Sequence, residues 1–168
     1  GSSRLGAPRR LFLGSTAASY TCTNTFSPSP TPSVSPGSST RLGFVEDDMG
    51  RTHQAGPPFT YLYCPPASGP HYNQPGTLGP ITPRVYKPDD KVGPPNWVHN
   101  LEHGAVVVLY RTDGPGATSD GQAAFNTFFN SFSASPICQV PPHALSPVIA
   151  PFNDMPHPFA ALVWGRVL

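Results

Sequence analysis

The sequence predicts a small α+β domain: a mixed or antiparallel sheet with one covering helix and long loops rich in proline and glycine. Three observations favour this class. Residues 105–110 (AVVVLY) form an unbroken apolar run, which is typical of a central strand. Residues 119–132 place apolar side chains at helical spacing. The chain has 24 prolines and 16 glycines in 168 residues, so long stretches are expected to lack regular structure.

Short runs rich in β-branched and aromatic residues predict further strands, at residues 10–13, 17–26, 59–63, 145–150 and 159–163. Between them, residues 64–97 are rich in proline and glycine and are predicted to hold little regular structure. The helix is expected to begin at Ser119 or Asp120, because either side chain can cap it. Its apolar positions should form one face toward the core: Ala124, Phe125, Phe128, Phe129 and Phe132.

Composition divides the chain into two parts. Residues 1–43 contain no acidic residue, and residues 27–40 read SPSPTPSVSPGSST, a pattern that favours extended polyproline geometry. We therefore predict an extended N-terminal arm (1–43) and one histidine-rich α+β domain (44–168). The arm is either a linker or O-glycosylated stalk, or a segment that lends a strand to a neighbouring chain. The second interpretation predicts a homo-oligomer or homopolymer assembled through the arm.

Charge and cysteine usage limit the function. Only 11% of residues are charged and the net charge is +1, without the basic run that nucleic-acid binding needs. No apolar stretch reaches the roughly 18 residues of a membrane span. The chain opens on Gly1 without a visible signal peptide, which fits a processed, extracellular or cell-surface product. In such a protein Cys64 and Cys138 could form a disulfide and leave Cys22 free, but the spacing does not decide the pairing.

The histidines carry the chemistry that this sequence can offer. His99 and His103 are four residues apart, so one helical turn would present both rings to one ion. Glu102 between them could orient a ligand through its second ring nitrogen or bind the ion directly. His53 and His71 lie in turn-rich segments, where the backbone fixes ligand geometry in advance. The alternative is a set of half-buried histidines joined by hydrogen bonds at the entrance to a strand.

Spaced motifs surround these histidines. Residues 50–53 read GRTH, residues 65–71 read PPASGPH, and residues 99–104 read HNLEHG before an apolar strand that ends in Tyr110. Residues 164–166 read WGR near the end of the chain. Over about residues 45–168 this pattern resembles the bacterial and archaeal family Domain of Unknown Function 3105. The resemblance implies a domain whose histidines matter, in proteins that are exported or membrane-tethered and have no established enzymatic role.

Met155 lies in a polar, proline-rich loop, and a thioether beside imidazoles favours copper, while histidines and water suit zinc equally well. We expect an extracellular, non-catalytic metal-binding domain, with copper as the first candidate ion and zinc as the second. The alternative is a zinc-dependent hydrolase, since residues 99–103 match H-x-x-E-H. The short run before Gly104 allows at most one helical turn, which argues against that motif. The expected ligands are His53, His71, His99, His103 and Met155, with Glu102 in support.

Overall fold

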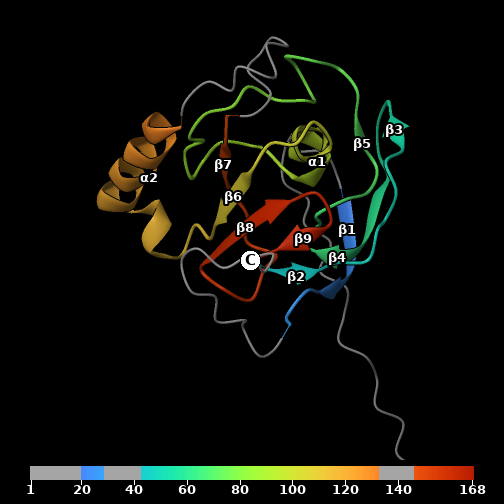
Figure 1. Ribbon diagram of the computed structural model, residues 1–168, viewed down its shortest axis with the longest axis horizontal. Helices are drawn as coiled ribbons and strands as arrows, with labels where there is room; N and C mark the ends of the chain where they lie inside the picture. The colour runs from blue at the N-terminus through green and yellow to red at the C-terminus, as the bar shows by residue number, and fades with distance from the viewer. Residues whose placement is uncertain (1–19, 29–42, 133–145) are drawn as a thin grey trace, which may run out of the picture.

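The computed structural model describes residues 20–28, 43–132 and 146–168, and these form an α+β fold, as predicted (Figure 1). The described residues contain one five-stranded mixed sheet, two two-stranded parallel sheets and two α-helices. Helix α1 is drawn between the main sheet and the β3–β5 pair in Figure 1, and it contacts both β5 and β6. This helix and the β3–β5 pair carry the candidate site.

The main sheet has the order β2-β9-β8-β6-β7. Its interior strand β6 (Val107–Tyr110) runs antiparallel to β8 (Phe159–Val163) and parallel to β7 (Val148–Pro151). The prediction of a central apolar strand is therefore confirmed, because β6 has a partner on each side. Two short strands, β9 (Arg166–Val167) and β2 (Phe44–Val45), complete the other edge.

Each small sheet is a parallel pair. Strand β1 (Tyr20–Thr25) pairs with β4 (Phe59–Cys64), and β3 (His53–Gln54) pairs with β5 (His71–Tyr72). The strand expected within residues 17–26 is therefore confirmed as β1, which pairs with β4 of the same chain. The strand expected at residues 10–13 lies outside the described residues.

A disulfide joins Cys22 to Cys64 and ties β1 to the domain. Of the pairings that the sequence left open, the one between Cys64 and Cys138 is thus excluded, and Cys138 lies outside the described residues. The sequence could not decide the pairing, because it did not show that β1 lies beside β4. Tyr20 strengthens the same attachment, since its hydroxyl donates to Asp154 Oδ2 over 2.7 Å.

Helix α1 (Pro94–Glu102) begins inside the segment predicted to be loop. Two prolines occupy its first turn, where the missing N–H groups have no helical partner to lose. The Asn96 Oδ1 atom accepts from the Gly93 N–H over 2.9 Å and closes the start of the helix. Gly104 ends it with a φ of 86°, a left-handed conformation that favours glycine. The helix therefore has nine residues, more than the single turn expected.

Helix α2 (Ser119–Ser131) confirms the predicted helix, but not its packing. It follows the 3-10 turn η1 (Pro115–Ala117), and Thr118, rather than Ser119 or Asp120, caps it by accepting from the Gly121 N–H. None of its residues is buried: Phe128 and Phe132 are 40% and 37% exposed. Phe125 reaches the sheet, with ring contacts to Tyr110 and Phe159.

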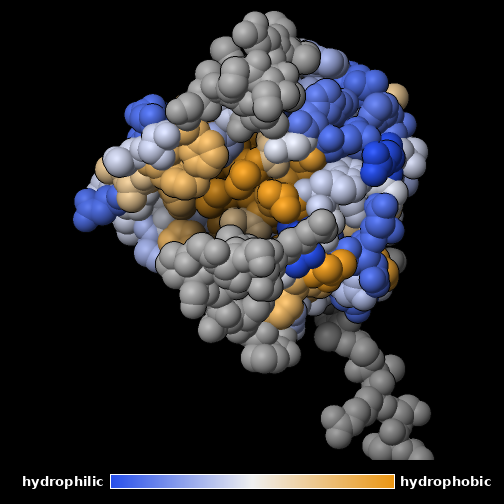
Figure 2. All heavy atoms as spheres, in the orientation of Figure 1, coloured by the Kyte–Doolittle hydropathy of each residue, from blue (hydrophilic) through white to orange (hydrophobic). Residues whose placement is uncertain are grey.

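The core lies between α1 and the main sheet. Trp97 and Leu101 of α1 are fully buried there, together with Val107 and Leu109 of β6. Figure 2 shows hydrophobic side chains gathered between α2 and the main sheet, while the side that carries β3 and β5 is hydrophilic. Among the described residues, no helix has the length and apolar character needed to cross a membrane.

Candidate metal centre

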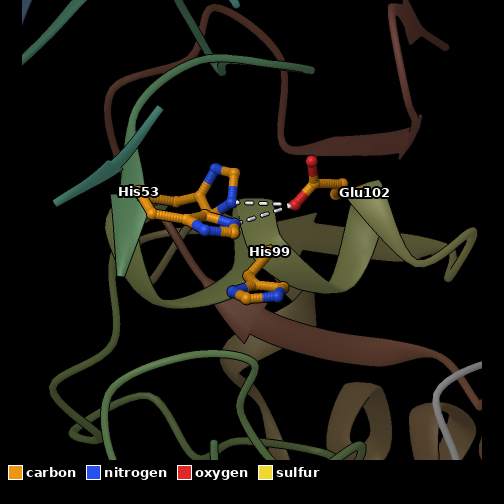
Figure 3. A group of neighbouring side chains, drawn as sticks. His53, His99 and Glu102 are labelled. Atoms are coloured by element: carbon orange, nitrogen blue, oxygen red, sulfur yellow. Dashed lines mark hydrogen bonds and ion pairs between the residues drawn. The ribbon is translucent and has the colours of Figure 1, made fainter. Parts of the chain in front are cut away.

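Three histidines and one glutamate converge where the β3–β5 pair meets the end of α1 (Figure 3). In the described part of the chain, each offers one ligand atom, and these atoms all lie within 4.8 Å of one another. A tetrahedral ion with ligands at about 2.0–2.1 Å separates them by roughly 3.4 Å, so small side-chain movements would close the group around one ion. The four residues are His53, His71, His99 and Glu102.

Two elements of the fold bring these side chains together. His53 and His71 are register partners in the parallel pair β3–β5, and their ring centroids are 4.9 Å apart. His99 and Glu102 are three residues apart on α1, a spacing that places both on one face of the helix. Because α1 packs against β5, its ligand-bearing face meets the paired strands.

Backbone carbonyls hold the second ring nitrogen of both buried histidines. The Nδ1 atom of His71 is 2.8 Å from the Gly69 oxygen, and Nδ1 of His99 is 2.6 Å from the Tyr72 oxygen. A carbonyl oxygen can only accept, so both Nδ1 atoms carry a hydrogen and donate it. In each neutral ring, Nε2 is then left with a free lone pair, the form in which imidazole binds a metal.

Glu102 faces two of these rings through a single oxygen. Its Oε2 atom lies 3.1 Å from Nε2 of His71 and 3.3 Å from Nε2 of His53. Burial lowers the pKa of His71, although the hydrogen bond to Gly69 and the charge of Glu102 oppose this effect. Burial alone would raise the pKa of Glu102, but hydrogen bonding to His53 and the charge that His71 and His53 carry when protonated, at the acidic pH where a carboxyl titrates, outweigh it, so its pKa lies below the usual value.

With the pKa values of His71 and Glu102 both lowered, two hydrogen-bond acceptors face each other. The side chain of His71 is fully buried, so we take its ring as neutral near pH 7, and the carboxyl of Glu102 as ionised. The lone pair of His71 Nε2 then points at a carboxylate oxygen 3.1 Å away. Only a proton or a metal cation between the two atoms makes this contact favourable.

His103 lies next to the group without being one of the four. It follows the last residue of α1, is exposed, and places Nε2 at 3.0 Å from Nε2 of His99. Because Nε2 of neutral His99 is an acceptor, Nε2 of His103 donates the hydrogen in this contact. Its role as a ligand stays a prediction, and a bound ion would have to replace this hydrogen bond at His99.

Met155 lies elsewhere. It is 4% exposed within the apolar core and borders a cavity of about 200 Å³, to which none of the four clustered residues contributes. The polar, proline-rich sequence around Met155 suggested a loop outside the core, and the burial of this side chain contradicts that expectation. Arg111 explains the burial, because its guanidinium donates to the Asn153 and Met155 carbonyls and holds the loop against the domain. The structure thus removes the observation that favoured copper over zinc.

The groups that orient the rings could not be found from the sequence, because they are backbone carbonyls. One sequence signal does point to them: the glycine in PPASGPH. Gly69 has a φ of 121°, and a Cβ atom there would lie 2.9 Å from ring atoms of Tyr61. Tyr61 also donates its hydroxyl hydrogen to the Pro70 oxygen over 2.6 Å. Glycine is therefore required in the turn that presents its carbonyl to His71.

Comparison with known proteins identifies a family for this chain. No curated protein and no solved structure matches the chain. Residues 53–168 match the family described as "Protein of unknown function (DUF3105)". That range covers most of the chain and all four clustered residues, so the protein belongs to this family.

Proposed function

We propose that this member of the DUF3105 family is a metal-binding protein that holds one divalent transition-metal ion between His53, His71, His99 and Glu102. The observation that carries the proposal is the orientation of the two buried rings. Both donate Nδ1–H to a backbone carbonyl, so the same backbone that buries them leaves each Nε2 atom as an acceptor with a lone pair for an ion. A cation would also relieve the contact between His71 Nε2 and Glu102 Oε2.

Copper(II) is the ion that we propose, with zinc(II) as the alternative. The donors are imidazole nitrogens and one carboxylate oxygen, which suit both ions. Copper(II) binds most tightly to such nitrogen and oxygen donors among the divalent ions of the first transition row. None of these donors is sulfur, and competition between the two ions tests the preference for copper directly.

We propose a non-catalytic role for the bound ion. In the hydrolase alternative, Glu102 would act as a free base beside a metal-bound water. Here Glu102 Oε2 already lies in ligand position, 3.1 Å and 3.3 Å from two imidazole nitrogens. The group of metal-ligating residues in the described chain contains no second carboxylate to serve as the base. Continuous helix through residues 99–102 is the one feature that favours the hydrolase.

Export and self-association remain parts of the same proposal. The disulfide between Cys22 and Cys64 supports an oxidising, extracellular compartment. Self-association through the arm is supported by the exposure of β1, which among the described strands pairs with β4 alone. A strand with a free edge can accept another chain. Sedimentation of the full chain at several concentrations tests this, and a monomer throughout would contradict it.

The metal proposal is tested by loading the full chain with Cu²⁺ or Zn²⁺ and measuring metal per chain by mass spectrometry. The wild type should retain about one equivalent, with Cu²⁺ displacing Zn²⁺ in competition. The variants His71→Ala and His99→Ala should lose the ion, while His157→Ala, which alters an exposed histidine outside the cluster, should keep it. Circular dichroism checks that each variant is folded. A wild type that retains no ion, or a His157→Ala variant that loses it, contradicts the proposed site.

A further inference from the structure

Glu46 is an acidic side chain that the metal centre does not use, and it is 2% exposed. Its Oε1 atom accepts from the Ala67 N–H over 2.6 Å. Its Oε2 atom is buried and has no hydrogen-bond partner in the described part of the chain. Buried carboxyl groups are uncommon, and burial is costly for a carboxyl oxygen without a hydrogen-bond partner.

Glu46 begins a ladder of hydrogen bonds that ends at the site. After the contact to Ala67, the Ser68 hydroxyl accepts from the Met49 N–H over 2.8 Å. Two backbone bonds follow: the Gly69 N–H donates to residue 50 over 2.7 Å, and the His71 N–H donates to residue 52 over 3.0 Å. The next pair along the ladder is the β3–β5 pair, which contains His53 and His71. Hydrogen bonds therefore join the two segments that lead to His53 and His71, residues 46–52 and residues 67–71.

The same residue connects this ladder to the main sheet. The backbone N–H of Glu46 donates to the Gly165 oxygen over 3.0 Å, next to the β2–β9 pair. Gly165 in turn donates its N–H to the Ala67 oxygen over 2.9 Å. Ala67 is fully buried, and its N–H and carbonyl are thus satisfied by Glu46 and Gly165. This three-way junction fixes the loop that leads to His71 relative to the sheet.

We propose that Glu46 is a positioning residue of the metal centre: by accepting from Ala67 it fixes the loop 67–71, and with it the rings of His71 and His53. The effect on metal binding rests on the proposed metal function, but the order of the loop 67–71 can be measured without an ion. It extends the metal-binding unit upstream of His53, where the match to the family begins.

The ionisation of Glu46 suggests the matched variant. Burial raises its pKa to about 8, against the lowering effect of the Ala67 hydrogen bond, so the group is mostly neutral at pH 7. Glutamine has the same shape, is neutral and keeps an oxygen that can accept from Ala67. Leucine has a similar volume and no acceptor. The pair Glu46→Gln and Glu46→Leu therefore separates the hydrogen bond from the space that the side chain fills.

Two further variants make the experiment decisive. Ser68→Ala removes a different step of the same ladder and causes a smaller disturbance if Glu46→Leu does not fold. Tyr110→Phe serves as a destabilised control. It removes the buried hydrogen bond, 2.6 Å long, that the hydroxyl of Tyr110 in β6 donates to the Tyr86 oxygen. For every full-length chain we would measure Cu²⁺ affinity, the electron paramagnetic resonance spectrum of the loaded protein, and amide hydrogen exchange without metal.

Glu46→Leu and Ser68→Ala should weaken Cu²⁺ binding about 10–100-fold, the usual effect of losing a group that supports a metal ligand, and should alter the resonance spectrum. Glu46→Gln and Tyr110→Phe should keep wild-type affinity and spectrum. Without metal, Glu46→Leu and Ser68→Ala should lose exchange protection at the amides of Gly69 and His71, whereas Glu46→Gln should keep it. Wild-type behaviour of Glu46→Leu and Ser68→Ala, or failure of Glu46→Gln to rescue, overturns the inference. If the wild type binds no ion, the metal proposal fails, and the exchange data still decide whether Glu46 fixes the loop.

Discussion

Replacing Glu102 by glutamine should stabilise the metal-free protein and weaken metal binding. In the metal-free wild type, the ionised carboxylate faces the lone pair of His71 Nε2 over 3.1 Å. The amide of glutamine can donate a hydrogen to that nitrogen and has nearly the same shape. A net gain of about 0.5–1.5 kcal/mol is typical of one such hydrogen bond. In a chain of this length that corresponds to a rise of roughly 1–6 °C in melting temperature.

In the loaded protein, the ion should add less stability to the variant than to the wild type. An ion at 100 times its Kd stabilises the wild type by about 2.7 kcal/mol. Loss of the anionic ligand should weaken affinity at least about tenfold, which removes about 1.4 kcal/mol of that stabilisation at the same ion concentration. Differential scanning calorimetry with and without Cu²⁺ measures both effects in one pair of samples.

The sign of the metal-free result is what tests the reasoning. If His71 instead carries a proton, Glu102 is the partner of an imidazolium and the substitution breaks an ion pair. The metal-free variant would then melt below the wild type. That result would refute the neutral state of His71 in the metal-free protein. Glu102→Ala is a suitable comparison, because it removes the carboxylate without supplying a donor.

Three other predictions follow from the fold. The double variant Cys22→Ser/Cys64→Ser should lose about 4 kcal/mol of unfolding free energy, because the bond closes a loop with a sequence separation of 42; chemical denaturation measures it, and a loss under about 1 kcal/mol contradicts the estimate. Glu46→Gln should gain stability over the wild type by about 1.4 kcal/mol per pH unit as pH rises from 4.5 to about 8. The reason is that the pKa of Glu46 is higher in the folded than in the unfolded protein, so the wild type loses stability as pH rises from the unfolded-state pKa to the folded-state pKa. A stability difference that does not vary with pH argues against the raised pKa. Met155→Leu should cost less than about 1.5 kcal/mol and leave Cu²⁺ affinity unchanged; a tenfold loss of affinity would return Met155 to the ligand set.

Much of the fold was predictable from local sequence, and the exceptions have physical causes. The apolar run at 105–110 identified β6, because a strand buried on both sides needs no polar alternation. Helix α1 was missed at its start, since Pro94 and Pro95 resemble a loop, although prolines are tolerated in a first turn. The two-residue strands β3 and β5 could not be predicted, because they depend on pairing between distant segments.

The candidate site shows the same division between local and distant information. Spacing identified His99 and Glu102, which share one face of α1, and the motifs identified His53 and His71. The disulfide partner of Cys64 and the burial of Met155 depend on contacts far apart in sequence, so the first was left open and the second was not expected. The orientation of the His71 and His99 rings depends on the positions of the Gly69 and Tyr72 carbonyls, which cannot be predicted from the identity of the side chains.

The uneven exposure of the ligands determines how an ion would exchange with its surroundings. The side chain of His53 is 45% exposed, while that of His71 is fully buried. A chelator can therefore approach from the His53 side and take the ion in a ternary complex while the buried rings stay in place. The rate of metal loss would then increase with chelator concentration. An ion enclosed on all sides would instead leave at a fixed rate set by opening of the fold.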